Sequence, residues 1–265
     1  MTARGFLNVV QRFAPAHALL RQRYARRFRT PQGAGSLCGV YASFQEAARA
    51  TPAEAPLGYD HEAPAALYRD RLDRITPKDY PALFWLREAL RGASTVFDLG
   101  GHVGVSFYAF RRYLEYPAAL RWVVCDVPAV AREGTALAHA RGERALAFTS
   151  EPREATGADV LLASGALQYI EQPLHELLAG LPVPPRDLIV NQVPTHPERE
   201  FFTVQHIGVA YCPYRIAAVD AIPATLEPLG YELVDRWDDP SRRTAVPYRP
   251  EAAPISYTGY YLRRR

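Results

Sequence analysis

A carboxylate followed at once by glycines is the segment of this sequence with the clearest chemical potential. The segment reads Asp98-Leu99-Gly100-Gly101-His102-Val103-Gly104 and comes directly after a short apolar run. Glycines allow a tight turn and let the backbone approach a ligand closely. In an open α/β sheet, ligands bind beyond the carboxyl ends of the strands. We therefore expect residues 98–104 to form part of a ligand site.

The position of Asp98 separates two kinds of ligand. A dinucleotide site places its glycines against a pyrophosphate, and a carboxylate at the same place would repel that phosphate. A carboxylate beside the cationic amino-acid tail of S-adenosylmethionine is favourable, and this cofactor carries no phosphate. A second acid, Asp126, ends the next apolar run, where a carboxylate can accept hydrogen bonds from both ribose hydroxyls. The two acids and the glycines together favour a positively charged nucleoside.

The elements that must position these residues follow from an alternation of apolar runs and helical segments after residue 93. Strands are predicted at 94–101, 120–126, 145–150, 158–165, 186–193, 231–237 and 256–264. Helices are expected at 104–115, from Pro128, at 173–180 and at 217–229, with a long irregular segment over 194–214. This order predicts an α/β fold, a Rossmann-like doubly wound sheet that is mostly parallel with an antiparallel C-terminal edge strand.

The N-terminal part has a different character. We predict a helical cap over residues 1–92 and a cofactor-binding domain over 93–265. Within the cap, residues 5–29 have the spacing of an amphipathic helix, and residues 1–44 hold seven arginines and no acid. This basic helix would either pack on the domain, form a partly ordered tail, or make peripheral contact with an anionic membrane or partner. Ser43 is expected to cap a short helix over 43–50.

Several segments resemble the class I S-adenosylmethionine-dependent methyltransferases. They are DLGGHVG at 98–104, VVCDVP at 123–128, ADVLLASGALQYI at 158–170 and TVQHI at 203–207. The resemblance covers about residues 39–264 and is closest to a bacterial family of methyltransferases linked to surface-polysaccharide gene sets. The superfamily motif usually reads D/E-x-G-x-G-x-G, whereas His102 stands here at the middle glycine.

The resemblance implies a site for S-adenosylmethionine, with S-adenosylhomocysteine as the product. The residues implied to bind the cofactor are Asp98, Gly100, Gly101, His102, Gly104, Asp126, Val127, Thr149, Ser150, Ser164 and Gly165. The residues expected near the acceptor are Gln168, Tyr169, Gln205, Tyr211 and Tyr59. The implied reaction is methylation of a small-molecule or glycan-type acceptor, and we expect oxygen to be the methylated atom.

An oxygen acceptor can require a base, and histidine suits that role near neutral pH. The candidates are His206 and His196, both in the predicted irregular segment after the fifth core strand. We favour His206, because Gln205 beside it would be able to orient an acceptor. The alternative for each histidine is a packing or surface position without a role in catalysis.

Composition excludes several other classes of protein. Hydrophobic residues make up 48% and charged residues 22%, as in soluble globular proteins, and no apolar stretch is long enough for a membrane span. The net charge of +3 arises from the N-terminal arginines, which disfavours nucleic-acid binding by the main domain. Lys78 is the only lysine beside 30 arginines, which we interpret as compositional bias.

No group of potential ligands has metal-site spacing, so we predict no metal. We also expect a cytoplasmic protein. Two alternatives remain. One is a nicotinamide-dependent oxidoreductase or sugar-modifying enzyme on the same sheet, which the absence of a G-x-G-x-x-G turn disfavours. The other is a non-catalytic, methyltransferase-like partner protein, which the intact glycine turn and Asp126 disfavour. The oligomeric state is not predicted.

Overall fold

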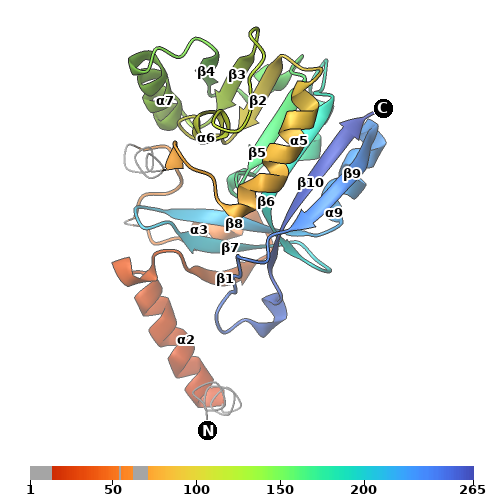
Figure 1. The fold of residues 1–265 in the computed structure, drawn as a ribbon. Helices are drawn as coiled ribbons and strands as arrows, with labels where there is room; N and C mark the ends of the chain where they lie inside the picture. The colour runs from red at the N-terminus through yellow and green to blue at the C-terminus, as the bar shows by residue number, and fades with distance from the viewer. Residues whose placement is uncertain (1–13, 54, 62–70) are drawn as a thin grey trace.

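The computed structural model describes residues 14–53, 55–61 and 71–265, and one sheet runs through this part of the chain (Figure 1). The strands are β1 (Leu37–Tyr41), β2 (Thr95–Leu99), β3 (Arg121–Cys125), β4 (Leu146–Thr149), β5 (Val160–Ser164), β6 (Asp187–His196), β7 (Phe201–His206), β8 (Tyr211–Ala218), β9 (Tyr231–Asp238) and β10 (Ser256–Arg264). The α-helices are α2 (Ala14–Phe28), α3 (Phe44–Arg49), α5 (Tyr80–Leu90), α6 (Val105–Phe110), α7 (Pro128–Ala140), α8 (Leu174–Ala179) and α9 (Ala221–Leu226).

The centre of the sheet is parallel, as the sequence predicts. Strands β4, β3, β2, β5 and β6 lie in that order, and each neighbouring pair is parallel. The two C-terminal strands pair antiparallel with each other. Here β10 lies between β6 and β9, so that β9 is at the border of the sheet. The Rossmann-like, mostly parallel fold is therefore confirmed.

Both faces of the central strands are buried by helices. Residues that alternate along β2, β5 and β6 contribute to two separate apolar clusters, for example Leu162 and Ile189 to one and Leu161 and Leu188 to the other. The first cluster includes side chains of α5, α6 and α7, and the second includes side chains of α8 and α9. Burial on both faces explains why these strands read as continuous apolar runs rather than as alternating patterns.

The segment after β6 is a β-hairpin, and the prediction of an irregular segment over 194–214 is wrong. Strands β7 and β8 pair antiparallel from Phe201–Ile216 to His206–Tyr211, and every residue of β7 is buried. The N-terminal strand β1 pairs with the outer side of β7, and β8 meets β6 at Thr195. The predicted helix at 217–229 is correspondingly shorter, because its first residues complete β8.

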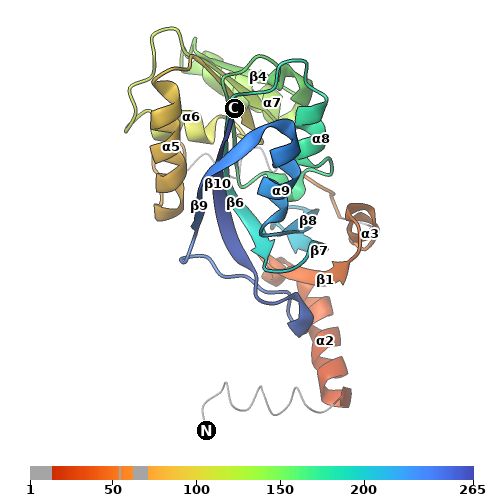
Figure 2. The same cartoon turned by 90° about the vertical axis from the view of Figure 1, so that its right-hand side faces the viewer.

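The described N-terminal part contains both helices and a strand. Helix α2 extends away from the sheet in both views, and residues 1–13 of the predicted basic helix lie outside the described residues (Figures 1 and 2). The predicted cap of α3 is confirmed, because the Ser43 side chain accepts a hydrogen bond of 3.1 Å from the Glu46 amide. Of the predicted N-terminal helical cap, residues 62–70 are not described, and Tyr80–Leu90 forms helix α5 before β2.

Candidate active site

A glycine turn joins β2 to α6. Gly100 and Gly104 have φ values of +72° and +88°, which glycine adopts without the steric cost that other residues carry. A Cβ atom on Gly100 would lie 2.3 Å from the Cβ of Ala166, and one on Gly101 would lie 2.4 Å from the carboxyl carbon of Asp98. The turn therefore has no room for side chains at these two positions, and a ligand meets bare backbone there.

The Asp98 carboxyl group lies behind the turn. Its side chain is buried, and Oδ2 accepts a hydrogen bond of 3.1 Å from the Trp122 indole. Oδ1 has no hydrogen-bond partner among the described residues. Burial raises the pKa of Asp98 to about 7, the nearby Asp126 charge adds to this rise, and the Trp122 bond opposes it. The protonated form of Asp98 is therefore more favourable near neutral pH than it is for an exposed aspartate.

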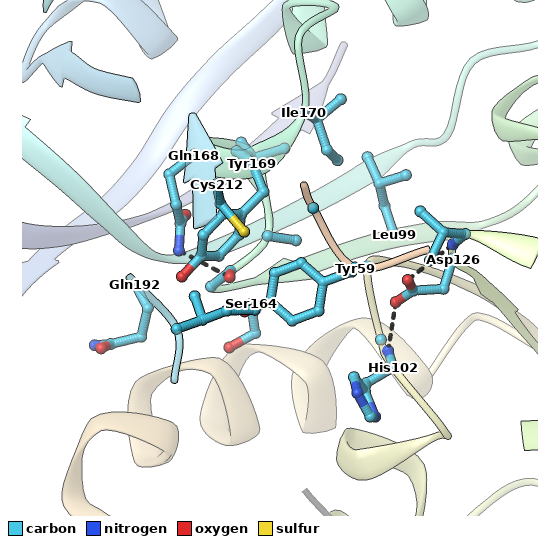
Figure 3. Close-up of a pocket in the computed structure, with 18 of the residues that line it drawn as sticks. Tyr59, Leu99, His102, Asp126, Ser164, Gln168, Tyr169, Ile170, Gln192 and Cys212 are labelled. Carbon is cyan, nitrogen blue, oxygen red and sulfur yellow. Dashed lines mark hydrogen bonds between the residues drawn. The ribbon is translucent and has the colours of Figure 1, made fainter. Parts of the chain in front are cut away.

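Asp126 follows β3, and backbone amides hold its carboxyl group. Oδ2 accepts a hydrogen bond of 2.9 Å from the His102 amide, and Oδ1 accepts one of 2.8 Å from the Val127 amide (Figure 3). Burial raises the pKa of Asp126 to about 6, and these two bonds oppose the rise. Each carboxylate oxygen has more than one lone pair, so Asp126 is able to accept further hydrogen bonds from ligand hydroxyls.

The turn and Asp126 border one cavity of about 1560 Å³. Small-molecule sites usually enclose roughly 300–1,000 Å³, so this cavity has room for a cofactor and an acceptor together. The predicted site residues that line it are Gly100, Gly101, His102, Asp126, Val127, Ser150, Ser164, Gly165, Gln168, Tyr169, Gln205, His206 and Tyr59. The predicted site residues that do not line it are Asp98, Gly104, Thr149, Tyr211 and His196.

Aromatic and amide side chains form the wall beyond β5. The Tyr169 hydroxyl donates a hydrogen bond of 2.5 Å to Oε1 of Gln205. The ring of Tyr169 meets the rings of Tyr59 and Tyr214 edge to face, with 5.2 Å between centroids in each pair. Residues from the N-terminal part, from the segment after β5 and from the hairpin therefore contact one another at this wall (Figure 3).

The two candidate histidines have different surroundings. His206 lines the cavity, and its ring stacks on Tyr211 with centroids 4.4 Å apart. Its Nδ1 has no hydrogen-bond partner among the described residues. His196 lies outside the cavity lining, and its Nδ1 accepts hydrogen bonds from the amides of Glu198 and Arg199, at 3.1 and 3.3 Å. The structure thus brings His206 to the site, whereas His196 stabilises the turn between β6 and β7.

The N-terminal part also supports the end of the cavity near Asp126. Oδ1 of Asp60 accepts a hydrogen bond of 2.9 Å from the Ala129 amide in the first turn of α7. Both Tyr59 and Asp60 line the cavity. A carboxylate at a helix N-terminus satisfies an amide that has no partner within the helix. The residues before α5 therefore belong to the site as well as to the fold.

Gln192 and Lys78 are among the lining residues that were not selected as site residues from the sequence. Gln192 is buried and has a φ of +58°, and its strand pairs irregularly with β10 between Thr258 and Tyr260. Such a pairing depends on a distant segment, so no local pattern marks Gln192. For Lys78 a signal was present, because it is the only lysine in the chain.

Among the described residues, no group of three or more His, Cys, Asp or Glu side chains is arranged to hold a metal ion. No helix in the same part of the chain combines the length and the apolar character needed to cross a membrane.

Comparison with known proteins gives structural matches only. No protein-family model matches the chain, and no curated protein matches it. The 1,6-didemethyltoxoflavin-N1-methyltransferase of Burkholderia thailandensis, solved with S-adenosylhomocysteine, is 20% identical over 80% of this chain and 93% of its own, with a TM-score of 0.50. The chain shares the methyltransferase fold. This likeness concerns the fold, because the sequences are too different to carry over a substrate.

Two further solved structures are similar over most of their length. The N-terminal domain of EvdMO1 with bound S-adenosylhomocysteine is 15% identical over 72% of this chain and 83% of its own, with a TM-score of 0.49. The mitomycin 7-O-methyltransferase MmcR is 18% identical over 98% of this chain and 75% of its own, with a TM-score of 0.46.

Proposed function

We propose that this protein is an S-adenosylmethionine-dependent methyltransferase that acts on a small-molecule or glycan-type acceptor, at oxygen. The observation that carries the proposal is the glycine turn and the Asp126 carboxylate bordering the same cavity. The methyltransferase fold and the S-adenosylhomocysteine bound to the toxoflavin enzyme support it. Because a Cβ on Gly100 or Gly101 would collide with its surroundings, the turn is built to keep its backbone bare.

In this proposal the cofactor spans the ends of β2, β3 and β5. Asp126 accepts hydrogen bonds from the ribose hydroxyls, with Val127 beside the adenine. The turn from Gly100 to His102 contacts the amino-acid part, and Asp98 behind the turn adds negative charge under that cationic part. Ser150 would lie near the adenine, while Ser164 and Gly165 would lie near the sulfur atom. Thr149 and Gly104 do not line the cavity, so they would act only by shaping the backbone of the site, whereas Asp98 would act through its charge from behind the turn.

When bound, S-adenosylmethionine supplies an already activated methyl group, so the protein has to align an acceptor and exclude water. We place the acceptor against Gln168, Tyr169, Gln205 and Tyr59. His206 accepts the proton that the acceptor hydroxyl loses as its oxygen attacks the methyl carbon. Its buried ring is held by stacking on Tyr211, so it is positioned before the acceptor arrives. We do not assign His196 to this step, because its Nδ1 already accepts two amide hydrogen bonds.

Calorimetry with S-adenosylmethionine, S-adenosylhomocysteine and NAD tests the proposed cofactor. We expect the first two to bind and NAD not to bind. The Asp126→Ala variant should bind S-adenosylhomocysteine more weakly by about 1.5–3 kcal/mol, because hydrogen bonds to a charged acceptor are lost. Binding of NAD alone would refute the proposal, and binding of none of the three would favour a non-catalytic partner protein.

The role of His206 is tested separately. Once an acceptor is found, His206→Ala should lower turnover by about 10²–10⁴-fold, the usual contribution of a general base. Its affinity for S-adenosylhomocysteine should stay close to that of the wild type. A variant with unchanged turnover would remove His206 from the mechanism and leave the cofactor assignment intact.

A further inference from the structure

Two buried glutamine side chains line the end of the cavity away from Asp126. Gln168 and Gln192 are 2% and 3% exposed, and in Figure 3 both lie on the other side of Tyr59 from Asp126. Nε2 of Gln168 donates to the Gly165 carbonyl at 2.8 Å, and Nε2 of Gln192 donates to Oδ2 of Asp239 at 3.1 Å. A carbonyl and an ionised carboxylate only accept hydrogen bonds, so these contacts fix which end of each amide is nitrogen.

Both residues line the cavity, and their two amide oxygens are buried hydrogen-bond acceptors in its wall. Neither Oε1 atom has a hydrogen-bond partner among the described residues. Buried acceptors without a partner are unfavourable, and they are strongly selective for a ligand that brings donors to them. Gln192 also has the left-handed backbone that is costly for a residue with a side chain, as is often found at ligand sites. Both glutamines thus point to an acceptor that carries O–H or N–H groups.

Lys78 and Arg242 are two of the cations that line the cavity, and each lies close enough to the other to affect it electrostatically. Both are half-buried, and neither forms an ion pair within 4.0 Å in the part of the chain that the structure describes. Arg242 is held over the ring of Tyr257, 3.9 Å from its centroid. Burial lowers the pKa of Lys78, and the charges of Arg71 and Arg242 lower it further.

The acids near these cations are already engaged. Asp79 accepts hydrogen bonds of 2.8 Å from the amide and the hydroxyl of Thr76. Asp239 accepts hydrogen bonds from Ser241 and from Gln192. Both carboxylates raise the pKa of Lys78 and so lie near it, but neither forms an ion pair with it. Neither cation therefore has an ion-pair partner among the described residues, although the charges of Asp79 and Asp239 partly offset that of Lys78.

Lys78 is anchored close to the end of β5, where the cofactor and the acceptor would meet. Nδ2 of Asn191 donates to the Lys78 carbonyl at 3.1 Å and to the Ser164 hydroxyl at 3.2 Å. Oδ1 of Asn191 accepts a hydrogen bond of 3.0 Å from Trp237. One amide therefore joins Lys78 to the residue that we place near the reacting methyl group.

From this arrangement we propose that the acceptor is an anionic, hydroxyl-bearing small molecule, such as an acidic sugar. Its carboxylate or phosphate would bind Lys78 and Arg242, and its hydroxyls would donate to Gln168 and Gln192. Hydroxyls rather than ammonium groups are the donors, because the two cations repel a second positive charge. This inference rests on the proposed function, since it names the substrate class of that site.

The single lysine gives a direct test. Reductive methylation with ¹³C-formaldehyde keeps the charge of Lys78 and labels it as the only lysine side chain of the whole protein. With S-adenosylhomocysteine at saturation, the probes are D-glucuronate, D-glucose 6-phosphate and the neutral control D-glucose. We expect at least one acid to shift the Lys78 resonance and to bind at least tenfold more tightly than glucose. The preferred acid distinguishes a carboxylate from a phosphate.

Variants test which side chains bind the acid. The affinity of each unlabelled protein for the probes is measured by calorimetry. Lys78→Gln and Arg242→Gln should each weaken binding of the preferred acid about tenfold and leave glucose binding unchanged. Arg141→Gln is the matched control, because that arginine lies over Tyr108 outside the cavity lining and should have no effect. Gln192→Leu should weaken the acid and glucose alike. Equal binding of acids and glucose, or acid binding that is insensitive to Lys78 and Arg242, would overturn the inference.

The cofactor's own carboxylate is the other possible source of the anion, and the same experiments separate it. If S-adenosylhomocysteine alone shifts the Lys78 resonance and Lys78→Gln weakens its binding tenfold, the cations hold the cofactor, and the inference about the acceptor is refuted. The proposed function would then still stand. Failure of S-adenosylhomocysteine to bind the wild type would instead refute the proposed function itself.

Discussion

The contributions of two buried aspartates to the free energy of unfolding should change with pH in opposite directions, and this difference tests the electrostatics of the site. Asp98 accepts one hydrogen bond, from Trp122, and its pKa is raised to about 7. Asp187 is equally buried, but it accepts hydrogen bonds from Tyr261, Arg263 and Arg186. Burial alone would raise the pKa of Asp187, and these donors lower it below its usual value. We therefore compare Asp98→Asn with Asp187→Asn.

The sign of each effect follows from proton linkage. The folded pKa of Asp98 is above the unfolded value of 3.8, so the folded state holds its proton more strongly between these values. The free energy of unfolding of the wild type should fall as pH rises from about 4 to about 7. A difference of about 3 pH units corresponds to about 4 kcal/mol. Asp98→Asn removes this loss. The free energy of unfolding of the variant, relative to that of the wild type, should therefore be up to about 4 kcal/mol higher at pH 8 than at pH 4.

Asp187 should behave in the reverse manner. Its folded pKa is below 3.8, so its contribution is present above the unfolded pKa and is lost as pH falls through the folded value. Asp187→Asn should therefore destabilise the protein at pH 8, and the difference from the wild type should shrink as the pH approaches 3.

Urea unfolding at pH 4, 6 and 8, followed by tryptophan fluorescence and circular dichroism, measures both variants against the wild type. A stability difference between Asp98→Asn and the wild type that does not change with pH would refute the raised pKa of Asp98. The same sign of pH dependence in both variants would show that burial alone, and not the set of donors, controls these carboxyl groups.

Three further changes test other parts of the structure. Gly101→Ala should cost about 1–3 kcal/mol of stability from overpacking against Asp98, and it should weaken S-adenosylhomocysteine binding. Gly92→Ala is the control and should do neither, because its Cβ would be 3.8 Å from its nearest neighbour. Equal melting temperatures and affinities in the two variants would contradict this. Affinity for S-adenosylhomocysteine, measured by calorimetry, should fall up to tenfold per pH unit below about 6 as Asp126 is protonated, and a flat profile there would exclude its ribose contact. Ser43→Ala should lower the unfolding free energy by about 1 kcal/mol through loss of a helix cap, without any effect on that affinity.

The central sheet could be predicted because its signals are local. A strand buried on both faces reads as an apolar run, as in 160–164, and a glycine turn marks the start of the next helix. The proposed cofactor end of the site depends on the same two signals. For this reason Asp126 and the glycines of the turn were selected together from the sequence, and the structure places Asp126, Gly100 and Gly101 at one cavity.

The proposed acceptor end could not be predicted in the same way, because distant segments build it. The hairpin of β7 and β8 was missed, although the apolar pattern on either side of Gly208 was an available signal. The backbone of Gln192 depends on an irregular pairing with β10, and the position of Lys78 depends on a hydrogen bond from Asn191. Interactions of this kind appear only when the whole chain is folded.

The insertion of β10 between β6 and β9 has a consequence for how the molecule is made. Tyr261 and Asp187 are hydrogen-bonded partners separated by 74 positions, so β6 lacks one neighbour until β10 has been synthesised. Contacts this distant slow folding, and an open strand edge invites pairing with other chains. A nascent chain halted before β10 should therefore be prone to aggregation, and expression from a truncated gene should yield insoluble material.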